Sequence, residues 1–405
     1  MSEPPTTRPR GDSRWWFRPP RRHGEVLAHR TVSYLELFYD LVFVVLIAQI
    51  SRSLAGDVTW VGVRDFLIVF ALIWIAWVNG TLYHDLHGRE DGRSRTYIFA
   101  QVSLLVLLSV FTVQAAEDPS DGRGFAIVFT LLVMLIAWQW FEVRRFDTPE
   151  WRPVAGRYVQ GIVIIAVIVA ISAALDNQDV RLALWGIAVG LSLAGNLVMT
   201  LRPRSDQMVQ ATRVTESLAE RFGLFTIIVL GEVVVGVANG LAASEHDFRT
   251  TATGLIALSI GFGFWWNYFD FVGGRVPGVG RARVAWMYGH LPLAIGISAT
   301  GAGMIGLVEH AGDGRTPTAT AWLISASTAT VALSIAVLTK TIDAHPGRRL
   351  VPLTLAVAAG ASLIAGAARP APWLLALILS GLLFAVWLEA FARHVRGGTM
   401  ISDPG

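Results

Sequence analysis

Carboxylate side chains recur within the long apolar segments of this sequence, where ionisable groups are rare. Glu36 and Asp40 are four residues apart at the start of the first such segment, so they share one face of a helix. Asp40 lies about 6 Å deeper than Glu36. A pair of acids at this depth predicts a proton or cation site. Structural hydrogen-bond or salt-bridge anchors are the alternative.

A second set of candidates lies near residue 232. Glu232 is twelve residues beyond Glu220, about 18 Å along a helix, which places it near the middle of its apolar segment. Glu232, Gly236 and Asn239 follow helical spacing and form one stripe, and Gly236 with Gly240 is a pair suited to close helix contact. Glu232 is the strongest candidate for a functional intramembrane acid, and interhelical hydrogen bonding is the alternative.

Asparagine and aspartate residues in two further segments complete the set. Asn79 follows Trp77 in the second apolar segment, and Asn267 and Asp270 are three apart in the eighth. These side chains are candidates to line a substrate path, or else to bridge helices.

The sequence offers little for metal or cofactor chemistry. His84, Asp85 and His87 cluster at one segment end, but His84 and Asp85 point in different directions on a helix, so we predict no metal site. The chain has no cysteine, which excludes disulfides and thiolate sites. It also lacks hydrolase, zinc-protease and cofactor fingerprints, so we expect neither an enzyme nor a bound cofactor.

These residues must be positioned by helices, because apolar stretches of about 17–25 residues recur twelve times between residues 35 and 391. Of the 33 lysine and arginine residues, 26 fall in alternate connections and the two tails. That alternation predicts an all-α bundle of about twelve transmembrane helices with both termini cytoplasmic. A charged content of only 16% agrees with a surface covered by lipid.

The two halves of the chain resemble each other. Glu36 and Glu220 both open spans, and in the span that follows each of them Asn79 comes two residues after Trp77 and Asn267 directly after Trp266. The number of residues from Glu36 to Glu220 is nearly the same as the number from Asn79 to Asn267, and it is close to half the length of the membrane region. We therefore expect a parallel repeat of two six-helix units, residues 34–202 and 203–395. The seventh span is expected at residues 222–241, which assigns Arg221 to the preceding connection.

The terminal segments are polar. Residues 1–33 form an Arg/Pro-rich tail that we expect to be disordered, and residues 396–405 form a short cytoplasmic tail. The run from Arg14 to Arg22 mixes arginines with Trp15, Trp16 and Phe17, which favours contact with anionic lipid headgroups, or a plain topology signal. The basic charge is a topology signal, so nucleic acid is not an expected partner.

Two of the motifs described above resemble a known family. The run from Glu36 to Val44 and the run from Glu220 to Glu232 are similar to the two signatures of the bacterial low temperature requirement protein A family. The resemblance covers roughly residues 30–395. It implies a multi-pass protein of the bacterial plasma membrane with a link to growth in the cold, and it carries over Glu36, Asp40, Glu220 and Glu232 by position.

Three functions follow as hypotheses, and the missing fingerprints weigh against the third, an intramembrane enzyme that acts on lipid. The first is a secondary transporter or ion-coupled permease for an unknown ion or small molecule, in which Asp40 and Glu232 bind a proton or cation. The second is a non-catalytic membrane protein that supports low-temperature growth through lipids or partners, with structural acids. Oligomeric state does not follow from the sequence.

Overall fold

The apolar segments form long helices in the computed structural model, which describes residues 18–25, 32–201, 214–245, 247–342 and 350–396. In chain order the helices are α1 (Tyr34–Gly56), α2 (Trp60–His87), α3 (Gly92–Thr112), α4 (Pro119–Phe146), α5 (Arg152–Ala173), α6 (Gln178–Leu201), α8 (Glu216–Ala243), α9 (Phe248–Phe271), α10 (Arg281–Glu309), α11 (Thr318–Lys340), α12 (Val351–Ala368) and α13 (Pro372–Arg396). The described residues contain no strand. The all-α prediction is confirmed.

Ten of the twelve described helices are long and apolar enough to cross a membrane, and α6 and α9 are the two outside that set. Large apolar side chains on the outer faces stay exposed, among them Val110 at 66%, Leu255 at 61% and Ile364 at 72%. Such faces suit lipid, which is as apolar as the side chains themselves. The prediction of a polytopic membrane bundle is therefore confirmed.

Capping side chains set where several helices begin. The side chains of Ser33, Thr59, Asp91, Asp118, Thr215 and Asp247 each accept a backbone N–H of the first turn that they precede. Thr215 starts α8 at Glu216, six residues before the expected start of the seventh span. Arg221 therefore lies inside the helix rather than in a connection.

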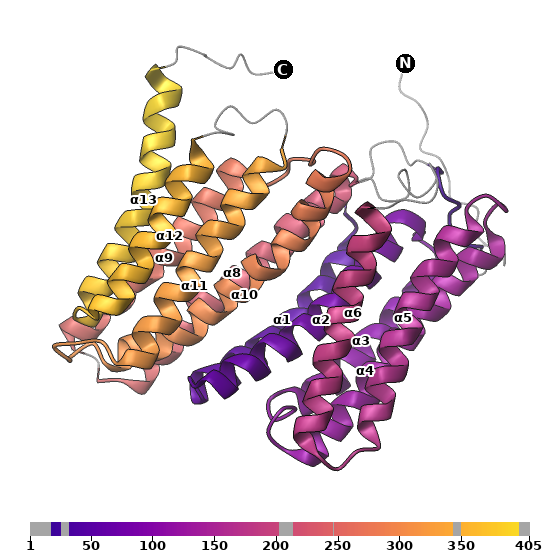
Figure 1. Cartoon of the computed structure of the whole chain (residues 1–405), viewed down its shortest axis with the longest axis horizontal. Coiled ribbons are helices and arrows are strands. Elements are labelled where there is room, and N and C mark those ends of the chain that lie inside the picture. The colour runs from indigo at the N-terminus through magenta and orange to yellow at the C-terminus, as the bar shows by residue number, and fades with distance from the viewer. Residues whose placement is uncertain (1–17, 26–31, 202–213, 246, 343–349, 397–405) are drawn as a thin grey trace, which may run out of the picture.

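The helices gather into two groups, α1–α6 and α8–α13, which lie side by side in Figure 1. Most pairs of helices that contact each other in the first group have an equivalent contacting pair in the second. The contact between α1 and α3 corresponds to that between α8 and α10. The contact between α2 and α6 corresponds to that between α9 and α13. The groups meet mainly through α1 against α8 and α10, and through α2 against α8. The parallel duplication and its domain boundaries stay predictions. The matching contacts in the two helix groups fit them.

Part of the N-terminal tail packs on the helices. The Arg21 N–H donates to the His87 carbonyl at 3.0 Å, and the Arg21 Nε donates to the Gly88 carbonyl at 2.7 Å. This places a buried cation at the C-terminal end of α2, where the helix dipole favours it. Residues 18–25 thus differ from the disorder expected of the tail. Residues Arg14–Phe17, expected to contact lipid, lie outside the described residues.

Candidate functional site

A buried ion pair joins the two helix groups. Asp40 of α1 and Arg221 of α8 are both 0% exposed. The Arg221 Nη2 donates to Asp40 Oδ1 at 2.7 Å, and its Nε donates to Oδ2 at 3.2 Å. Two parallel bonds of this kind are the strongest geometry for an arginine and a carboxylate. The pair lets both charges stay inside the bundle as a neutral unit.

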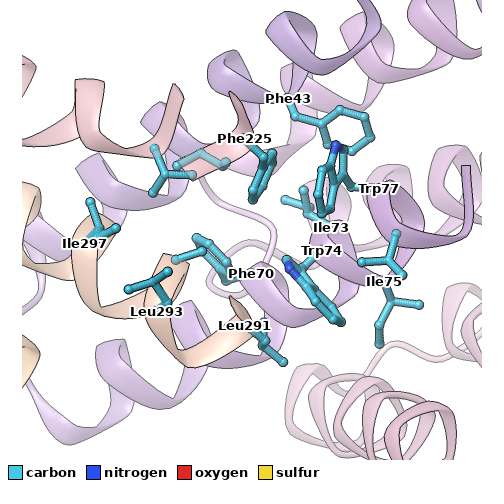
Figure 2. Packing of buried hydrophobic residues seen from close by; sticks show 14 of the residues in the cluster. Phe43, Phe70, Ile73, Trp74, Ile75, Trp77, Phe225, Leu291, Leu293 and Ile297 are labelled. Atoms are coloured by element: carbon cyan, nitrogen blue, oxygen red, sulfur yellow. The ribbon is translucent and has the colours of Figure 1, made fainter. Parts of the chain in front are cut away.

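The second helix completes the surroundings of this pair. The Trp77 Nε1–H of α2 donates to Asp40 Oδ1 at 2.9 Å, and the Arg221 Nη1 donates to the Thr81 carbonyl at 3.4 Å. The Trp77 ring stacks on Phe225 of α8 with 3.9 Å between centroids. Figure 2 shows Trp77, Phe43 and Phe225 together, with Leu291, Leu293 and Ile297 of α10 beyond. Aromatic packing thus closes the pair off from its surroundings.

Loss of the indole donor tests how much this bond contributes. We expect Trp77→Phe to lower stability by about 1.5–3 kcal/mol, because it removes a hydrogen bond to a charged, buried group. Thermal unfolding of the purified protein in detergent measures the change. Trp265→Phe is the control, since Trp265 is 42% exposed on α9. Equal effects of the two substitutions would show that the bond to Asp40 contributes nothing particular.

Glu232 forms a second polar cluster between the groups. It is 4% exposed on α8, and its carboxylate interacts with the Ser51 hydroxyl of α1, which also donates to the Ile47 carbonyl at 2.8 Å. The Ser51 hydroxyl also lies 2.6 Å from the Ser298 hydroxyl of α10. Arg52 adds an electrostatic attraction at longer range. Helices α1, α8 and α10 therefore meet around one carboxylate and two hydroxyls.

The Asp40–Arg221 pair and the Glu232 cluster are separated by the same number of residues on α1 and on α8. Asp40 and Ser51 are eleven residues apart on α1, and Arg221 and Glu232 are eleven apart on α8. Eleven residues make three turns, about 16 Å, and return to nearly the same face. Helices α1 and α8 therefore run parallel, with matched contacts at two depths. Both contacts also join residues that are equally far apart in the chain, at nearly the offset of the predicted repeat.

Close helix contact fixes the depth of Glu232. A Cβ on Gly236 of α8 would meet the Gly301 backbone of α10, and a Cβ on Gly301 would lie 2.6 Å from the Glu232 carbonyl oxygen. The small-residue pattern that the sequence showed at Gly236 thus serves a backbone-to-backbone contact.

Glu36 lies near the ion pair, and the other predicted residues lie elsewhere. Glu36 is buried, forms a capping box with Ser33 at the start of α1, and interacts electrostatically with Asp40 and Arg221. Glu220 and Asn239 are exposed on α8. Asn79 is half-buried and donates to the Ile75 carbonyl.

Two more predicted residues belong to the contact between α9 and α13. Asn267 is buried and donates to the Gly263 and Leu383 carbonyls, and Asp270 accepts the Trp387 indole N–H at 2.6 Å. Of the eight candidates, Asp40 and Glu232 are the two that directly contact the other helix group at the junction, and Glu36 lies one turn before Asp40.

The sequence reasoning missed Arg221, Ser51 and Ser298. Arg221 adjoins Glu220 in the second motif, and a helix start at Thr215 would have placed its charge inside the membrane segment. Ser51 stands behind the first motif as part of the family resemblance but received no role, and Ser298 carries no signal in sequence. Among the described residues, no group of three or more histidine, aspartate or glutamate side chains is arranged to hold a metal ion.

Comparison with known proteins supplies the family. The family model of the bacterial low temperature requirement A protein matches residues 31–388. An uncharacterized protein of Rhizobium meliloti (strain 1021) is 27% identical over 291 residues, which cover 67% of this chain and 68% of the relative. The region that the family model matches contains both motifs and all twelve described helices except the end of α13. The chain belongs to the bacterial low temperature requirement A family.

Proposed function

We propose that this protein is an ion-coupled secondary transporter of the bacterial plasma membrane, with Glu232 as the site that takes up a proton or cation. The observation that carries the proposal is the position of Glu232: a buried carboxylate at a contact between two helix groups, beside the Ser51 hydroxyl and, among the described residues, in no ion pair with a guanidinium. Intramembrane acids placed in this way mark ion pathways.

The arrangement of the helix groups supports the same function. Secondary transporters bind substrate between structural repeats and work by rocking one repeat against the other. Glu232, Ser51 and Ser298 lie where such a movement would change their contacts. Both termini are cytoplasmic in this proposal, because an even number of spans returns the chain to the arginine-rich side. The substrate is an ion or small molecule, and no chemical step is assigned to the protein.

The test is proton flux in liposomes that contain a pH dye and carry an imposed membrane potential. We expect the wild type to conduct or couple protons, and Glu232→Gln to lose that flux while it folds normally, because glutamine keeps the shape and the hydrogen bond but takes up no proton. Glu309→Gln is the control, since Glu309 is exposed at the end of α10. Equal flux in wild type and folded Glu232→Gln would refute the assignment of the site.

A second candidate function also has an observation in its favour. The Asp40–Arg221 pair is fully bonded and fully buried, as a structural anchor is. A non-catalytic protein that supports low-temperature growth through lipids or partners needs only such anchors. In that case neither the wild type nor any variant carries flux, and Glu232→Gln restores growth in the cold as well as the wild-type gene does.

A further inference from the structure

A row of buried polar residues follows α2 away from the Asp40–Arg221 pair. Thr81, His84 and His87 are spaced three apart on α2, so they follow one side of the helix in steps of about 4.5 Å. Their exposed fractions are 0%, 2% and 1%. The Thr81 carbonyl accepts from Arg221, so the row begins at the ion pair. It ends at the last residue of α2.

The N-terminal segment extends the row by one histidine. The His23 ring lies edge-on to the His87 ring with 4.4 Å between centroids. The His23 Nδ1 is 2.6 Å from Asp147 Oδ2, and its ring also stacks on Trp151. The His23 and Asp147 side chains are only 3% and 1% exposed. We call His84, His87, His23 and Asp147 the histidine row.

Aromatic and amide side chains surround the row. His84 Nε2 lies 3.4 Å from Gln101 Oε1, and its ring contacts those of Tyr39 and Tyr83. His87 Nδ1 bonds to the Arg21 carbonyl, and its ring contacts Trp140. Charged groups near the row are Arg21 beside His87, Asp147 beside His23, and Arg93 with Glu142 near Tyr83. Asp85, which follows His84 on α2, is also buried, and its carboxylate accepts from the hydroxyls of Thr215 and Ser217.

Several polar atoms along the row have no protein partner. Among the described residues, these are the hydroxyls of Tyr39 and Thr81 and the Nε2 atoms of His87 and His23. Buried polar atoms of this kind bind water, which can join neighbouring groups into a continuous hydrogen-bonded path. They occur between the ion pair and Asp147, so a continuous path along the row requires water bound at each of these atoms.

We propose that the histidine row is a proton relay between Asp147 and Asp40, with His23 supplied by the N-terminal segment. This inference rests on the proposed function. A proton on Asp147 passes to His23 Nδ1, while His23 Nε2 releases its own proton inward, and the ring then returns by changing tautomer. His87 keeps its Nδ1–H on the Arg21 carbonyl, so it takes up and releases the proton at Nε2. No electrons are transferred, and the proton finally reaches the Asp40 carboxylate. Chains of histidine and aspartate serve this purpose in membrane pumps.

The outermost histidine is in the state that a relay needs. Burial lowers the pKa of the His23 imidazole below 6.5, although its hydrogen bond with Asp147 acts in the opposite direction. At neutral pH the ring is therefore mostly uncharged and able to accept a proton.

The test uses the full-length protein in liposomes with an internal pH dye and an imposed potential. We expect His23→Ala to reduce proton flux by about 10²-fold, as loss of a positioned proton carrier does. Added imidazole should restore the flux, after subtraction of the leak through protein-free vesicles. His87→Gln should also lose flux, although glutamine can keep the bond to the Arg21 carbonyl. His310→Ala is the control, since His310 caps the C-terminal end of α10 and its side chain bonds to the Gly306 carbonyl of that helix.

The outcomes separate the relay from the proposed function. Full flux in His23→Ala, or a loss that imidazole does not restore in folded protein, overturns the relay. The transporter proposal survives that result if Glu232→Gln still abolishes flux. If the wild type carries no proton flux, the relay fails, and the proton is refuted as the ion taken up at Glu232.

Discussion

Replacement of Arg221 by methionine is expected to lower the stability of the protein by about 3–5 kcal/mol, because it leaves the Asp40 carboxylate buried without its partner. Asp40 is 0% exposed and keeps only the Trp77 indole as a donor after the change. Asp40→Asn should also lower the stability of the protein, since the Arg221 guanidinium then stays buried beside a neutral amide. The midpoint of thermal unfolding in detergent and the amount of folded protein in membranes measure both effects.

The double variant distinguishes a pair from two separate contacts. Asp40→Leu with Arg221→Met replaces both charges by apolar groups of similar volume, which is often neutral or stabilising at a buried site. We therefore expect the double variant to be more stable than Asp40→Leu or Arg221→Met alone. Arg393→Met is the control, because the Arg393–Glu389 pair is exposed and should contribute within about 1 kcal/mol. Additive losses in the double variant would contradict the pairing.

These experiments also show how far the sequence could lead. The length of the apolar segments and the alternation of arginine-rich connections predicted the helical membrane fold. The first follows from the thickness of the bilayer, and the second from the excess of arginine and lysine in cytoplasmic loops. Helical spacing correctly placed Asp40 and Glu232 inside their segments. It could not supply their partners, since Arg221 and Ser51 each lie almost half the chain away from the acid that they contact. Periodicity gives the face of a helix but not the helix that covers it.

Asn239 shows the same limit of helical periodicity, because this predicted site residue has no helix covering it. It shares a stripe with Glu232, seven residues and about 10 Å further along α8. Helix α1, which covers Glu232 at Ser51, ends only five residues later at Gly56. Nothing on α1 reaches the level of Asn239, which therefore stays exposed. The length of a neighbouring helix decided the outcome, and the stripe alone carries no information about it.

The contact between α8 and α10 leads to the second large effect that we expect. Gly301→Ala should destabilise the protein by about 1–3 kcal/mol or more, because the new Cβ would lie 2.6 Å from the Glu232 carbonyl oxygen and 2.7 Å from its carbonyl carbon. Backbone atoms cannot rotate away as a flexible side chain does, so the two helices must separate. Thermal unfolding in detergent measures the loss.

Gly231→Ala is the matched control, since a Cβ at Gly231, next to Glu232 on α8, meets nothing within 4 Å. Alanine favours a helix over glycine by about 1 kcal/mol, so this variant should be as stable as the wild type or more so. The two glycine variants also report on function, because separation of α8 from α10 moves the Glu232 carboxylate away from Ser51 and Ser298. Proton flux should then fall in Gly301→Ala and persist in Gly231→Ala. If Gly301→Ala folds and conducts like the wild type, the close contact does not hold Glu232 in place, and the site must depend on Ser51 alone.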